Sequence, residues 1–146
     1  MSSSTVTETE FSVWQQLRNN IFETEVWMRS TLKDFLDEFN ITQQQLSILR
    51  ILKEASNEPM STKQIQALML EKSSDTSRLV DRLIDKELVR KRKDPKDARL
   101  VQVLKYEGLR LLAQIEDQQA ELDQKFSLLN EEEAEQLSLL LEKTRS

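Results

Sequence analysis

The 146-residue sequence has no cysteine and no histidine, and it contains only one glycine and two prolines. The lack of cysteine excludes disulfides, a thiol redox switch and thiolate metal sites. The lack of histidine excludes imidazole metal ligands and the Ser-His-Asp and Cys-His catalytic arrangements. With so little glycine and proline, the composition is typical of a helix-rich protein. We therefore expect no metal and no cofactor.

The sequence also lacks a long hydrophobic run. No apolar stretch approaches the roughly 20 residues that cross a bilayer. Residues 1–10 are acidic and rich in Ser and Thr, without the basic start and apolar core of a secretory signal. We therefore expect a cytoplasmic protein that does not bind membranes. Residues 1–10 are expected to be disordered, and the remaining length suits about one domain.

Charge is distributed unevenly along the chain. The formal net charge is −5, which by itself argues against a nucleic-acid partner. Residues 88–105, however, include seven basic and two acidic side chains, so this segment carries +5 and the rest of the chain −10. A short basic segment on an acidic body predicts a surface directed at a polyanion.

Hydrophobic periodicity predicts long helices toward both ends of the chain. Apolar residues recur at steps of three, four or seven over residues 14–39, which is typical of one face of a helix. The amphipathic pattern over residues 107–129 predicts a second long helix. Asn130 suits the N-cap of a last helix, and the three glutamates after it complement the helix dipole.

Shorter helices are expected between them. Capping boxes begin at Thr42 and Ser61, each with Gln three residues later, and both predict a helix start. The helix after Ser61 is expected to end near residue 69 or 70. A fourth helix with Ser73 or Ser74 as its N-cap follows after a tight turn. Two short helices joined in this way predict a helix-turn-helix unit.

The period then changes from helical to alternating. Residues 88–93 and 99–104 predict two β-strands around a charged turn that contains Pro95. The sequence therefore predicts a mainly α fold with a small β-hairpin, namely a winged helix-turn-helix with N- and C-terminal dimerisation helices. The expected regions are a winged helix-turn-helix DNA-binding region over residues 41–106 and a helical dimerisation region over residues 11–40 and 107–146.

The expectation of a homodimer follows from the apolar helix faces. A single chain of this length would leave much of the apolar pattern over residues 14–39 and 111–141 uncovered, and large exposed apolar patches normally mark interfaces. Packing within one chain is the alternative. A two-fold dimer would present two recognition helices to half-sites about one helical turn apart, or a multiple of it, on a pseudo-palindromic operator.

The fourth helix is the candidate for entering the major groove of double-stranded DNA, since recognition helices contact bases mainly with their N-terminal residues. Arg78 is suited to a bidentate contact with guanine, and Arg82 to a phosphate. A capped, solvated helix start is the alternative interpretation of this stretch. The expected DNA-binding residues of this helix are Ser73, Ser74, Thr76, Ser77, Arg78 and Arg82.

In the hairpin, Arg99 is expected to reach an adjacent minor groove, where a narrow A·T-rich groove attracts arginine. Asp97 lies two residues before it and is placed to hold the guanidinium in one pose. Lys96 is expected to meet the DNA backbone. The alternative for the basic strand over residues 90–93 is a solvated edge that Lys and Arg protect from aggregation.

Four segments together resemble the MarR (multiple-antibiotic-resistance regulator) family of bacterial transcription factors. They are Ser-Arg-Leu-Val-Asp-Arg-Leu at 77–83, Leu-Val-Arg-Lys-Arg at 88–92, Asp-Pro-Lys-Asp-Ala-Arg at 94–99 and Glu-Gly at 107–108. The resemblance covers about residues 41–112 in motif and the whole chain in helix order. It implies that Ser77, Arg78 and Arg82 line the recognition helix and that Asp97 and Arg99 form a wing-tip pair. It also implies a homodimer in which the first helix and the last two helices interlock.

Two positions depart from the family pattern. Glu87 stands at a helix end where the family often has Gly, the residue that best tolerates left-handed backbone. Lys105 stands where the family often has Thr, so the helix that follows loses an expected N-cap. Neither departure touches the expected DNA contacts.

Many members of the family release DNA when a small molecule, often aromatic or anionic, binds between the dimer helices and the DNA-binding part. The resemblance therefore implies an effector of this kind. Trp27, Met28 and Arg50 are the candidates for lining its pocket. The alternative is that Trp27 and Met28 belong to the core and that Arg50 is solvated.

The expected function is a sequence-specific, homodimeric DNA-binding transcription regulator that acts as a repressor. A helical protein–protein interaction module that uses a winged helix without DNA is the alternative, and it accounts well for the acidic body. The +5 hairpin favours DNA. An enzyme is not expected, since no Gly-rich phosphate loop is present, and Asp94 and Asp97 lie on a charged hairpin where they shape the wing.

Overall fold

The computed structural model describes residues 11–72 and 74–146. Within them the chain forms seven helices and one two-stranded antiparallel sheet. None of the described helices is long and apolar enough to cross a membrane. In chain order the elements are α1 (Val13–Asp37), α2 (Gln43–Glu54), α3 (Thr62–Leu68), α4 (Thr76–Asp85), β1 (Val89–Lys93), β2 (Leu100–Leu104), α5 (Tyr106–Asp117), α6 (Gln119–Gln124) and α7 (Glu131–Thr144).

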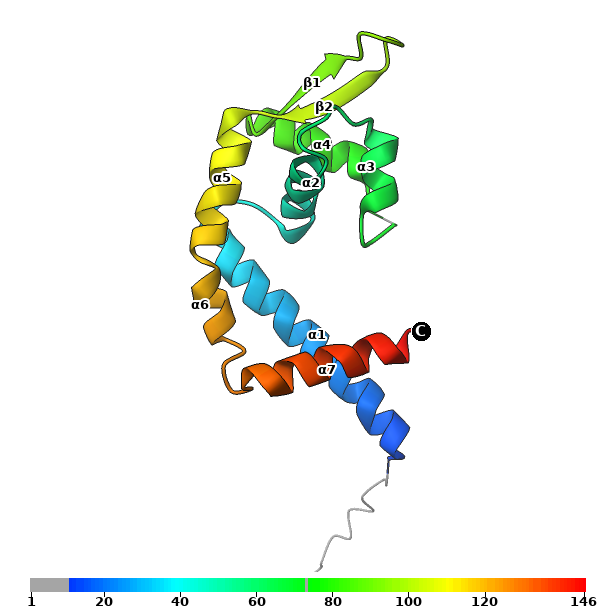
Figure 1. Ribbon diagram of the computed structural model, residues 1–146, viewed down its shortest axis with the longest axis vertical. Helices are drawn as coiled ribbons and strands as arrows, with labels where there is room; N and C mark the ends of the chain where they lie inside the picture. Colours follow the sequence, from blue (N-terminus) through cyan, green and yellow to red (C-terminus); the bar gives the residue numbers. More distant parts are fainter. Residues whose placement is uncertain (1–10, 73) are drawn as a thin grey trace, which may run out of the picture.

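The elements form a winged helix-turn-helix at one end of a long helical body. Figure 1 shows α1 as a rod that leads to a group made of α2, α3, α4 and the β1–β2 hairpin. The hairpin projects from this group, and α5 runs back from it toward the end of α1, with α6 and α7 beyond. The predicted mainly α fold with one small hairpin is confirmed.

The apolar core lies within the winged helix and the start of α5. Side chains from α2, α3, α4, β1 and α5 form one buried cluster, and α1 contributes Leu36 from its last turn. Burying a Leu or Ile side chain stabilises a fold by about 1.5–3 kcal/mol. The fully buried members include Leu36, Ile48, Leu49, Leu52, Ile65, Leu83, Leu112 and Ile115.

Local capping signals start the helices where the sequence predicts them. The capping boxes that begin at Thr42, Ser61 and Asn130 are each complete, with both reciprocal hydrogen bonds formed. An N-cap of this kind is worth about 1 kcal/mol. Lys105 is the N-cap residue of α5, and its side chain forms no capping hydrogen bond. This confirms the prediction that α5 lacks the N-cap expected from the family pattern.

The predicted start of the fourth helix is wrong by one or two residues. Asp75 is the N-cap of α4, because its Oδ1 accepts a hydrogen bond from the amide of Arg78 at 3.1 Å. The hydroxyl of Ser74 accepts a bond from the Gln44 side chain instead. The other candidate, Ser73, lies outside the described residues.

The predicted helix over residues 107–129 is also wrong in its length, since the chain forms α5, a break at Gln118, α6 and then turns up to residue 129. Gln118 leaves helical geometry with φ −101° and ψ 7°. Bonds between residues three apart, such as that from the Phe126 amide to the Asp123 carbonyl, tighten the chain there. No residue of α6 is buried, so no core packing holds this stretch in one straight helix.

The only glycine, Gly108, allows α5 to pack closely on the chain between α4 and β1. A Cβ at this position would collide with the backbone carbonyl of Leu88. That carbonyl also accepts a hydrogen bond from the amide of Lys105 at 3.0 Å. The junction therefore joins the end of the helix-turn-helix to the start of α5 through backbone contact.

Glu87 ends α4 in the left-handed region, with φ 62°. The amide of Leu88 donates to the carbonyl of Leu83 at 3.0 Å, and the amide of Glu87 donates to that of Ile84 at 2.9 Å. This is the Schellman pair of bonds, which normally has Gly at the left-handed residue. The Cβ of a non-glycine residue there costs about 1–2 kcal/mol.

We therefore expect the Glu87→Gly variant to be more stable than the parent by about 1 kcal/mol, since it removes the left-handed strain at the cost of some unfolded-state entropy. Urea denaturation followed by far-UV circular dichroism, at one protein concentration, measures the change. Glu87→Ala is the control, because it removes the charge and keeps the Cβ. An equal gain in both variants would show that the charge, not the backbone, is responsible.

Candidate nucleic-acid interface

The candidate recognition surface is the side of α4 that faces away from the core. Leu79, Val80 and Leu83 point into the core, and Arg78 and Arg82 are exposed. Arg78 and Arg82 are four residues apart, so they occupy the same side of the helix. Ser77 is also exposed beside Arg78. The outer side of α4 therefore presents two guanidinium groups and one hydroxyl.

Two other expected contact residues are buried. The side chain of Thr76 is 2% exposed, and its Oγ1 has no hydrogen-bond partner in the described part of the chain. Ser74 is 9% exposed, and its hydroxyl is occupied by Gln44 Nε2 at 3.2 Å. Because both hydroxyls face the protein, we leave Ser74 and Thr76 out of the surface that can meet DNA.

The wing tip is organised by two aspartates. Asp94 Oδ1 accepts from the amide of Lys96 at 2.9 Å, and the carbonyl of Arg99 accepts from the amide of Asp94 at 2.7 Å. Asp97 holds Arg99 twice, through a 2.6 Å ion pair between Oδ2 and Nε and through a 3.1 Å bond from the Arg99 amide to Oδ1. The expected contact between Asp97 and Arg99 is thus present. The pair is exposed, so it contributes little to stability and instead sets the direction of the guanidinium.

Basic side chains cover the exposed part of the hairpin. The residues of β1 after Val89 are all exposed, and Lys96 and Arg99 are exposed in the turn. Lys91 Nζ lies 3.8 Å from Asp81 Oδ1 of α4, which links the strand to the recognition helix. The +5 segment therefore forms one cationic surface next to the outer side of α4.

The base of the wing is held by a residue that the sequence analysis missed. The side-chain amide of Asn57 bonds the backbone of Leu104 twice, accepting from its amide at 2.7 Å and donating to its carbonyl at 3.3 Å. Met60 adds a β-bridge to Gln102 on the same strand. β2 is therefore paired on both sides, by β1 and by the segment before α3. The signal in the sequence is the polar break over residues 56–59, where Asn tolerates the left-handed backbone found there (φ 55°).

The other end of α4 is anchored by Lys86, which the sequence analysis also missed. Its Nζ donates to the backbone carbonyl of Asn40 at 2.6 Å and to Gln45 Oε1 at 3.1 Å. Desolvation by burial lowers the pKa of the Lys86 ammonium, and the charge of Arg82 lowers it further. Lys86 therefore ties the C-terminal end of the recognition helix to the turn between α1 and α2.

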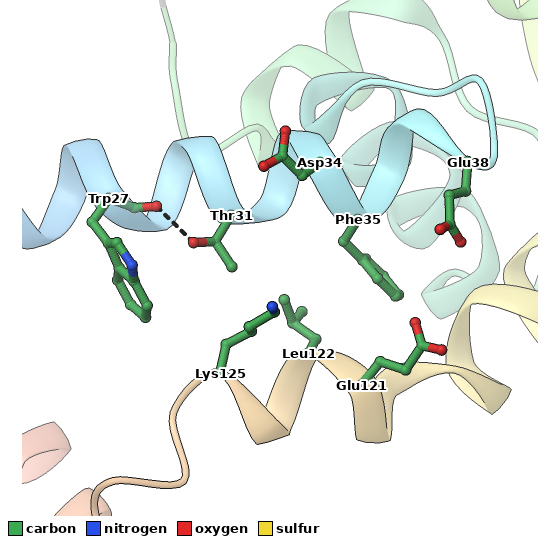
Figure 2. A pocket seen from close by; sticks show the side chains of 8 residues that line it. All are labelled: Trp27, Thr31, Asp34, Phe35, Glu38, Glu121, Leu122 and Lys125. Atoms are coloured by element: carbon green, nitrogen blue, oxygen red, sulfur yellow. Dashed lines mark hydrogen bonds between the residues drawn. The ribbon is translucent and has the colours of Figure 1, made fainter.

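A cavity of about 340 Å³ lies between α1 and α6. Figure 2 shows Trp27, Thr31 and Phe35 of α1 on one wall and side chains of α6 and the residue after it on the other, while Asp34 points away from α6. Trp27 is in this wall, whereas neither Met28 nor Arg50 lines the cavity. The lining residues are Trp27, Thr31, Asp34, Phe35, Glu38, Glu121, Leu122 and Lys125.

Large apolar side chains remain exposed on the helical body of the single chain. Trp14 and Phe22 of α1 are 69% and 68% exposed, and three leucines of α7 are 47–60% exposed. A helix face of this kind normally belongs to an interface. These side chains lie in the regions for which the sequence predicts dimerisation, 11–40 and 107–146.

The helix-turn-helix, the hairpin beside it and the long flanking helices define the chain as a winged helix-turn-helix protein. Residues 41–101 match the model of the MarR family. This match confirms the predicted resemblance of the winged helix-turn-helix region to the MarR family. None of the curated proteins matches the sequence of the chain.

Solved structures of transcription regulators share this fold. A MepR–DNA complex from S. aureus is 26% identical, with 93% of this chain and 96% of that chain covered and a TM-score of 0.68. A mutant MarR from E. coli complexed with operator DNA is 22% identical, with 88% and 93% covered and a TM-score of 0.77. The organohalide-sensing transcriptional regulator RdhR, in its 2,4-dichlorophenol-bound form, is 19% identical, with 99% and 86% covered and a TM-score of 0.82.

Proposed function

We propose that the protein is a homodimeric transcription repressor that binds a pseudo-palindromic operator in double-stranded DNA and is released from it by a small molecule. The observation that carries this proposal is the pairing of two cationic elements at one end of the chain. Arg78 and Arg82 are exposed on α4, and Arg99 is held in a fixed direction by Asp97 in the adjacent wing. A protein-docking module has no need of either feature.

The recognition helix is suited to the major groove. Arg78 lies in the first turn of α4, the part of a recognition helix that reaches base edges, and its fork matches O6 and N7 of guanine. Arg82 is one turn further along and fits a phosphate. Ser77 beside them is small enough to allow close approach of the helix. We assign base readout to Arg78 and backbone positioning to Arg82.

The wing is suited to the neighbouring minor groove. Arg99 is the guanidinium that Asp97 orients, and narrow minor grooves attract such side chains. Lys96 and the other basic side chains of the hairpin supply the phosphate contacts. Because this surface is basic and the rest of the chain is acidic, the electrostatic field favours approach to DNA from the wing side.

The dimer follows from the uncovered helix faces over residues 11–40 and 107–146, which we assign to dimerisation. A partner that covers the exposed apolar side chains of α1 and α7 removes them from water at a gain of about 25 cal/mol per Å². A two-fold axis through this body would place two copies of α4 on two half-sites of one duplex. Pseudo-palindromic operators match that arrangement.

Release by a small molecule is supported by the position of the cavity. It lies between α1 and α6, and α1 leads directly to the Asn40 carbonyl that holds Lys86 of α4. The similar RdhR structure holds 2,4-dichlorophenol. A ligand that changes how α1 sits against α6 would therefore bias the position of the recognition helix.

Solution measurements with the purified protein test this proposal as a whole. We expect sedimentation velocity to show a dimer and the affinity for DNA to fall steeply with salt, by about 10³-fold between 50 and 200 mM if six phosphates are neutralised. Selection from random duplexes should return a two-fold symmetric site, and a promoter carrying that site should be less active when the protein is present. A monomer that binds no duplex at low ionic strength contradicts the proposal.

We expect Arg99→Ala to lower DNA affinity by about tenfold or more at fixed salt, because it removes the minor-groove contact, while stability changes by less than about 1 kcal/mol because the ion pair is exposed. Fluorescence anisotropy with the selected duplex and thermal unfolding provide the two measurements. Arg18→Ala is the matched control, since it removes the same charge from α1. Equal losses in both variants would mean that only net charge matters.

We expect Arg78→Ala to relax the base preference at one position of each half-site, because a bidentate arginine discriminates by about 1–3 kcal/mol. Arg82→Ala should weaken binding to all sequences alike and reduce the salt slope by about one per protomer. Repeating the selection with each variant separates the two roles. An unchanged motif from the Arg78 variant would refute base readout by that residue.

A further inference from the structure

We propose that the cavity between α1 and α6 is an effector site for an aromatic organic cation. The notion of an effector rests on the proposed function, whereas the chemical class of the ligand comes from the side chains that line the cavity. Its shape, its charge and its connection to α4 each contribute to the argument.

The apolar part of the cavity suits one or two fused rings. Trp27 and Phe35 project from α1, and Leu122 of α6 lies opposite them (Figure 2). The volume of about 340 Å³ is at the small end of the range for ligand pockets. Trp27 is held in place by an edge-to-face contact with Phe126, with ring centroids 5.2 Å apart. A flat ligand would therefore meet preformed aromatic walls.

The charged part of the cavity is acidic. Three acidic residues, Asp34, Glu38 and Glu121, are among the lining residues, against the single ammonium of Lys125. The carboxylate of Asp34 points away from α6, so Glu38 and Glu121 supply the charge that faces the cavity (Figure 2). Figure 2 shows Glu38 and Glu121 approaching the Phe35 end from opposite walls, while Lys125 reaches toward Thr31. In the described ranges none of these three carboxylates forms an ion pair. Two like charges that face one cavity repel each other, and a bound cation relieves that repulsion.

The end of α1 adds to the negative potential. Glu38 is the C-cap of α1, and the last turn of this helix contains no basic residue. The carbonyls at a helix C-terminus act as a partial negative charge, which Lys86 at the Asn40 carbonyl offsets in part. An aromatic cation gains from this potential, from the carboxylates and from the faces of the rings. An anionic ligand of the same shape is repelled by the helix end and by the carboxylates.

The cavity is connected to DNA binding through α1. Phe35 and Glu38 lie five and two residues before Asn40, whose carbonyl accepts the bond from Lys86 at the end of α4. A ligand wedged between the end of α1 and α6 therefore acts close to the anchor of the recognition helix. Binding there and binding of DNA are expected to oppose each other, since each favours its own position of α1.

Three probes of one shape test the charge preference: 2-naphthamidinium, neutral 2-naphthamide and 2-naphthoate. We expect isothermal titration calorimetry on the dimer to show the cation binding at least tenfold more tightly than the amide, with naphthoate weakest. Trp14→Phe leaves Trp27 as the only tryptophan, so quenching of its emission reports the location of the ligand. Equal or tighter binding of naphthoate, or no binding of the cation, overturns the proposal.

Variants of the carboxylates test the site itself. The double variant Glu38→Gln/Glu121→Gln should lower the affinity for 2-naphthamidinium at least tenfold, and Lys125→Gln should raise it. Glu54→Gln is the matched control, because it neutralises an exposed helical carboxylate outside the cavity and should leave the affinity unchanged. All the substituted residues are exposed or lie at the surface, and circular dichroism checks that each variant is folded. An unchanged affinity in the double variant overturns the proposal.

DNA binding measured on the same samples separates this inference from the proposed function. Saturating 2-naphthamidinium should lower the DNA affinity of the parent at least tenfold and leave the DNA affinity of the Glu38→Gln/Glu121→Gln variant unchanged. The variant also serves as the control for binding of the probe to DNA itself. Binding of the probe without an effect on DNA overturns the effector role. Failure of the parent to bind DNA without any probe would count against the proposed function instead.

Discussion

Among the residues of α1, all of which the structure describes, only Leu36 is buried, and through it the long N-terminal helix is seated on the core of the winged helix. The core closes around α2, α4 and α5 and leaves the rest of α1, all of α6 and all of α7 uncovered. The winged-helix end of the chain therefore has a core of its own, whereas its helical body gains one only in the homodimer that we propose. In that dimer, the spacing of the two recognition helices depends on how the exposed helix faces meet.

The distribution of charge also separates the winged helix from the helical body. The cationic surface is confined to the hairpin and the outer side of α4, while the body carries the excess of carboxylates. The ion pairs on this surface are exposed and stabilise the fold little, so their main effect is to orient the basic side chains. Asp97 shows this most clearly, since it reduces the local positive charge and in return orients Arg99 through two contacts.

Features set by neighbouring residues could be predicted from the sequence. The capping boxes at Thr42 and Ser61, the N-cap at Asn130 and the two strands of the hairpin depend on contacts within a few positions, and they appear as expected. Features set by tertiary contact could not. The break at Gln118 arises where no core supports the helix, and the burial of Thr76 depends on how α4 packs.

The candidate site divides in the same way. Arg78, Arg82 and the pair of Asp97 and Arg99 follow from local pattern, and the structure leaves all four exposed. The hydrogen bonds that support these residues could not be predicted from local pattern. Asn57 bonds Leu104 across 47 positions of sequence, and Lys86 bonds Asn40 across 46. Of the cavity, only Trp27 was among the expected residues, since its walls come from helices far apart in the sequence.

Hydrogen bonds from other segments hold both ends of α4. At the C-terminal end, Lys86 is partly buried and bonds the Asn40 carbonyl, and the left-handed Glu87 follows it in the Schellman turn. At the other end, Asp75 caps the helix, and Gln44 of α2 donates to Ser74 just before it. A shift of the α1–α2 turn would therefore act first on the C-terminal end of α4, because Lys86 bonds to that turn. Arg82 lies one turn before Lys86, so the phosphate contact that we assign to it is the one most sensitive to a ligand bound beside α1.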